Sequence, residues 1–188
     1  MKILVTGGNR GLGKHIVEKL NADSISRSNG YDICLDVEKI VELSLTYDVF
    51  INNAFSGNFA QSELYYKIFA AWKNAGKTGY IINIGSSGNK STIGVSPTEF
   101  YRVTKAALEY ASKQGTQSFR KNEVRFKTSL INFDRLDSEL SRSRPNWTGN
   151  GVSMDDIVNT IELLTKGKSH TCIEEVTFAC NFFMKAET

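Results

Sequence analysis

The sequence predicts an α/β protein with a doubly wound parallel sheet, in a single domain that spans residues 1–188. Short apolar runs alternate with helical patterns along the whole chain, which is typical of a parallel sheet with helices on both faces. A glycine-rich turn joins the first apolar run to the first helical pattern. The length of 188 residues suits one domain, and 40% hydrophobic with 23% charged residues is ordinary for a globular chain.

The first half of the chain contains four predicted strands. The run KILVT is stopped by two glycines, and apolar residues then recur at helical spacing through GLGKHIVEKL. Two further strands and a brief helix, VEKIVEL, precede the very apolar YDVFINNA, which ends in two asparagines. We therefore expect strands at 2–6, 24–26, 31–37 and 47–54, with helices at 11–20 and 37–43.

The second half continues the alternation. A helical pattern leads to the buried-looking strand YIINIG, and a long helix with one apolar face leads to VRFKTSLINF. A helix capped by Ser153 precedes the final apolar run. We expect helices at 61–72, 100–119 and 153–167, and strands at 80–85, 124–133 and 173–183.

Composition excludes several classes of function. The chain has 23 Lys and Arg against 20 Asp and Glu, a net charge of +3 that is too small to indicate a nucleic-acid or membrane partner. No apolar run approaches the ~18 residues of a membrane span, and the N-terminus lacks a signal-peptide pattern. Three cysteines without paired spacing favour reduced thiols. We expect a cytoplasmic protein with no metal site.

The glycine turn TGGNRGLG suits a phosphate, because glycines admit close backbone approach and a helix N-terminus offers free N–H groups. A P-loop matches Gly8, Gly13 and Lys14, but His15 stands where Ser or Thr must bind magnesium. The alternatives are a dinucleotide-binding turn, with its first glycine directly after the strand, and a turn that binds nothing.

A second candidate site combines a tyrosine, a lysine and a serine. Tyr101 and Lys105 are four residues apart on one face of the long helix, where a lysine charge eases proton transfer from a phenol. Chance alone also produces such pairs, so the context matters. Ser86 ends a predicted strand upstream and would donate a hydrogen bond to the same substrate oxygen.

With these motifs in order, the chain resembles the short-chain dehydrogenase/reductase family over nearly its whole length. TGGNRGLG is similar to the family's cofactor loop, Asp36-Val37 to its adenine-contacting pair, and Asn52-Asn53-Ala54 to its NNAG motif. Ser86, Tyr101 and Lys105 match its catalytic serine, tyrosine and lysine. The resemblance implies a Rossmann fold and an NAD(P)-dependent oxidoreductase that acts on a small carbonyl or alcohol substrate.

The resemblance also implies a role for each matched residue. Tyr101 would be the general acid or base, Lys105 would assist it and bind the nicotinamide ribose, and Ser86 would hold the substrate oxygen. Asn58, 28 residues before Ser86, would be the family's fourth catalytic residue, a proton-relay asparagine, with a turn or helix N-cap role as the alternative. The cofactor would be bound by residues of the loop, the strand ends and the long helix, namely Gly7, Asn9, Arg10, Gly11, Leu12, Gly13, Arg27, Asp36, Val37, Asn53, Ala54, Tyr101 and Lys105.

Charge favours NADP(H) over NAD(H). NAD-preferring proteins carry an acid at the end of the second strand, whereas this chain has Arg27 there and Arg10 in the glycine loop. Two arginines suit a 2′-phosphate, although either can simply face water. NAD(H) remains the alternative cofactor.

The chain departs from the family pattern in several places. It is shorter, Phe55 replaces the glycine of NNAG, and Asn132-Phe133-Asp134 replaces a Pro-Gly that usually meets the nicotinamide. The substrate loop is reduced to about residues 134–151, whose basic residues favour a solvated loop over an anion site. The alternative function is a cofactor-binding regulator with little turnover; a sugar epimerase would need a substrate lobe that this chain lacks. The family resemblance also implies a homodimer or homotetramer.

Overall fold

The computed structural model of this chain describes residues 1–90, 99–145, 147, 149–167 and 170–180. Within them six parallel strands form one sheet in the order β2-β1-β3-β4-β5-β6. The strands are β1 Ile3–Thr6, β2 Asp23–Ile25, β3 Val49–Asn52, β4 Thr78–Ile84, β5 Arg125–Phe133 and β6 Glu175–Phe178. The helices are α1 Gly11–Leu20, α2 Val37–Ser44, α3 Ala60–Asn74, α4 Glu99–Arg120, α5 Glu139–Arg142 and α6 Met154–Lys166, with short 3-10 turns η1 Arg27–Asn29 and η2 Ser87–Lys90.

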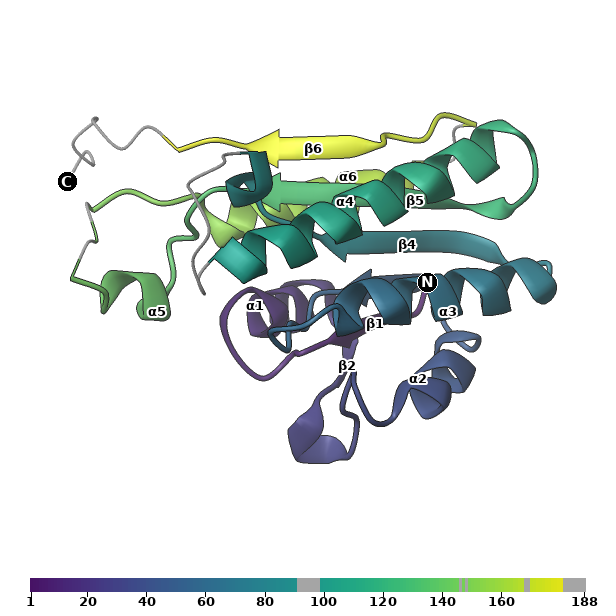
Figure 1. The fold of residues 1–188 in the computed structure, drawn as a ribbon, viewed down its shortest axis with the longest axis horizontal. Helices are drawn as coiled ribbons and strands as arrows, with labels where there is room; N and C mark the ends of the chain where they lie inside the picture. Colours follow the sequence, from purple (N-terminus) through teal and green to yellow (C-terminus); the bar gives the residue numbers. More distant parts are fainter. Residues whose placement is uncertain (91–98, 146, 148, 168–169, 181–188) are drawn as a thin grey trace.

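Helices cover both faces of the sheet (Figure 1). Alternate side chains of each central strand enter opposite cores, because successive residues of a strand point to opposite faces. Val5 packs in the core beneath α1 and α6, whereas its neighbour Leu4 packs in the core beneath α2, α3 and α4. This two-sided burial confirms the predicted doubly wound α/β sheet.

Most predicted elements are confirmed within a few residues. Ser153 accepts a hydrogen bond from the Asp155 amide at 3.2 Å, which is the predicted cap of α6. The last predicted strand is shorter, as β6 Glu175–Phe178, and residues 181–183 lie outside the described part. In that part no helix has the length and hydropathy that crossing a membrane requires.

The strand predicted at 31–37 is wrong: this segment forms turns that lead into α2. The Asp32 carboxylate accepts from the Cys34 amide at 2.7 Å, and the Asp36 carboxylate accepts from the Asp32 amide at 2.7 Å. Aspartate side chains that bind nearby amides favour turns over strands. Only residues 26–30 separate β2 from this segment, too few for the dozen or so residues of a parallel crossover.

All six strands are parallel, so their carboxyl ends meet at one edge of the sheet. The loops after β1, β2, β3 and β4 leave from this edge, and they contain the glycine turn, Arg27, Asn53 and Ser86. The edge is where ligands bind in open α/β sheets.

Candidate active site

The glycine loop between β1 and α1 is held tightly against the end of β3. Gly7 has a φ of +76°, a conformation that favours glycine, and its carbonyl lies beside Asn53. The Asn53 side-chain nitrogen donates to the carbonyl of Thr6 at 2.9 Å and to that of Gly7 at 3.3 Å. A Cβ on Gly13 would lie only 2.1 Å from the Gly7 carbonyl oxygen, so this position requires glycine.

Helix α1 begins at the end of this loop. Arg10 is its N-cap residue, and an arginine side chain has donors only, so it cannot satisfy the first amides of the helix. The first turn of α1 also has no acidic residue. Free amides and the positive end of the helix dipole therefore face the loop, an arrangement that suits a phosphate group.

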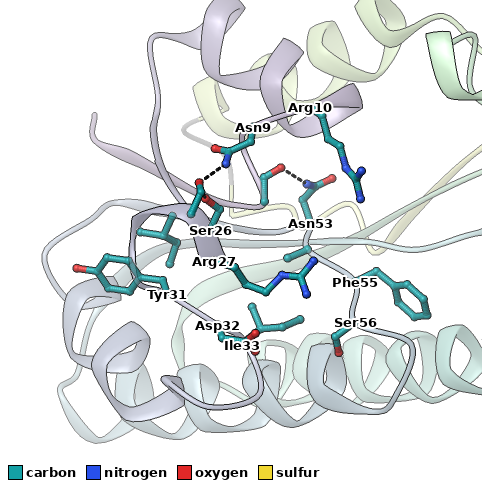
Figure 2. A pocket seen from close by; sticks show the side chains of 14 residues that line it. Asn9, Arg10, Ser26, Arg27, Tyr31, Asp32, Ile33, Asn53, Phe55 and Ser56 are labelled. Carbon is teal, nitrogen blue, oxygen red and sulfur yellow. Dashed lines mark hydrogen bonds between the residues drawn. The ribbon is translucent and has the colours of Figure 1, made fainter.

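A cavity of about 590 Å³ lies beside the loop, at the ends of β1, β2 and β3. Figure 2 shows Arg27 extending across it toward Phe55 and Ser56, with Arg10 on the glycine-loop side. Asn9 closes one wall by donating to the Ser28 hydroxyl. The lining residues are Gly7, Asn9, Arg10, Ile25, Ser26, Arg27, Ser28, Tyr31, Asp32, Ile33, Asn53, Ala54, Phe55 and Ser56.

The structure brings Asp32 and Ile33 to this cavity instead of the predicted pair Asp36 and Val37. Asp36 is the N-cap residue of α2 and Val37 is its first residue. The cause is the turn that replaces the predicted strand. Because the chain turns away at this point, the residues next to the cavity come four positions earlier than predicted. The Cys34 amide lowers the pKa of the Asp32 carboxyl, with a smaller contribution from the nearby Arg27 charge.

A second cavity of about 630 Å³ adjoins the first and shares Arg10, Asn53 and Phe55 with it. The two cavities therefore meet at these residues, and we refer to the two adjoining cavities together as the groove. The second cavity is lined by Arg10, Gly11, Leu12, Gly13, Asn53, Phe55, Ile84, Gly85, Tyr101, Lys105, Phe133, Leu136, Ser138, Glu139, Leu140 and Ser143.

Tyr101 and Lys105 both line this second cavity, one helical turn apart on α4. The Lys105 amino group donates to the Ile84 carbonyl and to the Gln61 side-chain oxygen, both at 2.9 Å. Lys105 is only 4% exposed, and this burial lowers its pKa from 10.5 to about 7. A lysine with a pKa near neutrality can hold or release a proton at physiological pH.

Phe55 occupies the place of the NNAG glycine and contacts both of these side chains. Its ring packs edge-on against Tyr101, with centroids 5.0 Å apart, and lies 5.3 Å from the Lys105 amino nitrogen. Phe55 is therefore part of the wall between the glycine loop and the Tyr101–Lys105 pair.

Ser86 lies just beyond β4, but it is not among the residues that line the cavity. It is 6% exposed, and its hydroxyl oxygen accepts from the Gly88 amide at 3.2 Å within the η2 turn. The structure thus places two members of the predicted triad, Tyr101 and Lys105, on the cavity, whereas Ser86 lies outside its lining and accepts one hydrogen bond within a turn.

The structure does not bring Asn58 to Lys105. The Asn58 side chain accepts from the Ala60 amide at 2.9 Å and from the Ser56 hydroxyl at 2.6 Å, and its amide nitrogen faces the Cys34 sulfur. These contacts match the alternative of a turn residue, because an asparagine side chain commonly accepts from the amide two residues further on, and the N-cap residue of α3 is Phe59.

Gln61, which the sequence reasoning missed, is the α3 residue that reaches Lys105. The sequence of α3 contains a pattern that could have identified Gln61. Leu64, Tyr65, Ile68 and Trp72 form a buried stripe, and Gln61 is a polar residue at the start of that stripe. A buried polar side chain needs a partner, so its position indicated a specific contact.

The shortened substrate loop contributes one wall of the second cavity through Leu136, Ser138 and α5. Arg142 in this loop binds Asp137 through two hydrogen bonds of 2.6 and 3.0 Å. Its charge is thereby neutralised at the surface, which supports the solvated-loop interpretation over an anion site.

The segment that replaces Pro-Gly is anchored to neighbouring elements. Asn132 donates to the Glu175 carboxylate at 2.9 Å, and Asp134 accepts from the Ser87 hydroxyl and from the Cys180 amide. Phe133, between them, lines the second cavity. This wall is aromatic in place of the expected proline and glycine.

No family model matches the sequence, and no curated protein matches it significantly. Solved structures, however, match the fold over nearly the whole chain. A metagenomic short-chain oxidoreductase in complex with NADP has a TM-score of 0.66 at 20% identity, covering 95% of this chain and 96% of its own. A 3-ketoacyl-(acyl-carrier-protein) reductase from Brucella melitensis, complexed with NADH, has a TM-score of 0.74 at 16% identity over 95% and 96% of the two chains.

A short-chain dehydrogenase from Burkholderia cenocepacia J2315, in complex with NADP, has a TM-score of 0.69 at 16% identity over 94% of this chain and 89% of its own. The chain therefore has the fold of the short-chain dehydrogenases/reductases, as its motifs predicted. At these identities the likeness establishes the fold, and the activity must be argued from the residues of the site.

Proposed function

We propose that this protein is an NADP(H)-dependent oxidoreductase that interconverts a small carbonyl compound and its alcohol. The observation that carries the proposal is the shared groove, because it joins a glycine loop and helix N-terminus suited to phosphates with a cavity that contains Tyr101 and Lys105. A single elongated dinucleotide would occupy both halves. A bound nicotinamide would supply the hydride.

The described residues fit such a cofactor. Gly7 and Gly13 let the loop pack closely against Asn53, and the free amides of α1 suit the pyrophosphate. Arg10 and Arg27 line the adenosine half, where two guanidinium groups suit a 2′-phosphate. Asp32 lines the same cavity, and its negative charge would disfavour that phosphate. NADP(H) is therefore the proposed cofactor, with NAD(H) as the alternative.

The proposed proton chemistry uses Tyr101 and Lys105. Tyr101 would donate its phenolic proton to the substrate oxygen during reduction and accept it back during oxidation. Lys105, with its lowered pKa, would return a proton to Tyr101 and take one from water. The Ser86 hydroxyl oxygen accepts from the Gly88 amide, and its own O–H would donate to the substrate oxygen.

We also propose a homodimer through α3 and α4 in the cytoplasm. Three apolar side chains stand exposed there, with Tyr66 at 48%, Val103 at 53% and Tyr110 at 66%. Tyr66 donates to Gln114, one turn beyond Tyr110, so these residues lie on a continuous surface. Sedimentation velocity of the wild type and Tyr110→Asp tests the dimer, since a buried charge would favour monomers.

The experiment for the activity combines a fluorescence titration with NADPH and NADH and a panel of carbonyl substrates. Tyr101→Phe should abolish turnover and leave the NADPH dissociation constant within a few-fold of wild type, because it removes only the phenolic hydroxyl. If the wild type binds NADPH but turns over no carbonyl or alcohol in the panel, the alternative of a cofactor-binding regulator is favoured. Absence of binding to either cofactor would refute both functions.

A further inference from the structure

Two uncharged acceptors hold the Lys105 amino group on the side that faces the protein interior. Gln61 Oε1 and the Ile84 carbonyl oxygen each accept from Nζ at 2.9 Å. An ammonium group has three N–H bonds, so these contacts use two of them inside the protein. The remaining position on the nitrogen is the one available to the cavity that Lys105 lines with Tyr101.

The orientation of the Gln61 amide is set by its surroundings. Its Nε2 donates to the Asn52 carbonyl at 2.7 Å and to the Ile84 carbonyl at 3.2 Å. Two carbonyls require the amino end of the amide on that side, so the oxygen end must face Lys105. Gln61 is 3% exposed, and its own backbone carbonyl accepts from the Asn52 side chain at 2.9 Å.

The same network continues through the sheet to α4. Asn52 on β3 donates to Asn83, its neighbour in register on β4, at 2.9 Å, and Asn83 donates to Ser112 at 2.9 Å. The Ser112 hydroxyl donates to the Leu108 carbonyl, also at 2.9 Å. Ser112 and Leu108 are on the helix that bears Lys105, so a continuous chain of hydrogen bonds links Gln61 to that helix, in addition to its direct bond with Lys105.

We propose that Gln61 is a positioning residue for Lys105. It holds the amino group so that the third position on the nitrogen, the one not bonded to Gln61 or Ile84, faces Tyr101 and the bound cofactor. The proposal rests on the proposed function for its catalytic meaning. With two N–H bonds fixed inward, a protonated Lys105 presents one N–H to the cavity, and a neutral Lys105 presents its lone pair there. The lysine can therefore give a proton to Tyr101 and recover one from solvent without rotating.

In the part of the chain that the structure describes, no charged side chain accepts a hydrogen bond from the Lys105 amine. The groups that face it are the Gln61 amide from α3, the Ile84 carbonyl from β4, the Phe55 ring, and Tyr101 on its own helix. Arg10 and Glu139 line the same cavity from the glycine loop and α5. Because the hydrogen-bond partners of the amine are uncharged, we expect a change at Gln61 to alter its protonation.

The test measures protonation of Lys105 in the full-length apo protein. Lysine labelled with ¹³C at Cε reports the titration of each amine by NMR, and Lys105→Met identifies the Lys105 signal. In Gln61→Met the pKa of Lys105 should fall by about one pH unit, because the ammonium loses an acceptor. In Gln61→Glu it should rise by about one to three pH units, because a carboxylate replaces the amide oxygen. Gln117→Asn, an exposed substitution on α4, is the matched control and should leave the titration unchanged.

Turnover provides a second, separable measurement. Gln61→Met should lower kcat at least ten-fold and shift the pH profile, with the NADPH dissociation constant within a few-fold of wild type. A Lys105 titration that is the same in wild type and Gln61→Met overturns the proposal, and so does an unshifted pH profile in an active variant. If no carbonyl is turned over by the wild type, the proposed function fails, and the NMR titration still decides whether Gln61 controls Lys105.

Discussion

Substituting Lys105 by methionine changes how the stability of the fold depends on pH. In the folded protein burial lowers the pKa of Lys105 from 10.5 to about 7, whereas the unfolded chain exposes the amine to water. Between these two pH values unfolding takes up a proton. Raising the pH therefore makes unfolding less favourable, and the cost of burying this lysine falls.

The magnitude follows from the two pKa values. Linkage predicts that the unfolding free energy of the wild type rises by about 2.5 kcal/mol, relative to Lys105→Met, between about pH 7.5 and pH 9.5. The methionine keeps the length of the side chain and removes the titrating group. Other groups that ionise in this range are common to both proteins, so they cancel in the difference.

The assay is urea unfolding of both proteins at several pH values, followed by circular dichroism and fitted with a common slope. The difference in unfolding free energy between the two proteins should narrow or reverse steadily as the pH rises. Two curves that stay parallel across this range would show that folded Lys105 keeps its proton, and the argument from burial would be wrong. A change in the opposite direction would contradict the sign of the shift.

Three further predictions concern the groove. Arg27→Asp should narrow or reverse a preference for NADPH over NADH, measured by fluorescence titration; a wild type that binds NADH as well as NADPH would contradict the charge argument. Gly13→Ala should destabilise the fold by about 2 kcal/mol or more in urea unfolding, since its Cβ would lie 2.1 Å from the Gly7 carbonyl oxygen, and Gly167→Ala, with its nearest contact at 3.7 Å, is the control. Phe55→Gly should speed NADPH association in stopped-flow measurements, because the ring stands between the two halves of the groove; an unchanged rate would show that the ring does not obstruct the cofactor.

The sequence alone determined the features that depend on local pattern. Alternating apolar runs and helical stripes predicted the parallel sheet. The Ser153 cap and the glycine turn could also be predicted, because a few adjacent residues determine such structures. The spacing of Tyr101 and Lys105 likewise placed both on one face of α4, since residues four apart on a helix are neighbours.

Contacts between distant segments were decided only by the tertiary structure. The apolar residues of 31–37 predicted a strand, but its two aspartates and the short connection from β2 produce turns. As a result, Asp32 and Ile33 line the cavity instead of Asp36 and Val37. Counting residues placed Asn58 at the relay position, whereas the packing of α3 against β3 and β4 brought Gln61 to Lys105. Spacing along a chain specifies a side chain's neighbours on its own helix or strand, but a partner 44 residues away is selected by how helices and sheet pack and by which buried polar groups must be satisfied.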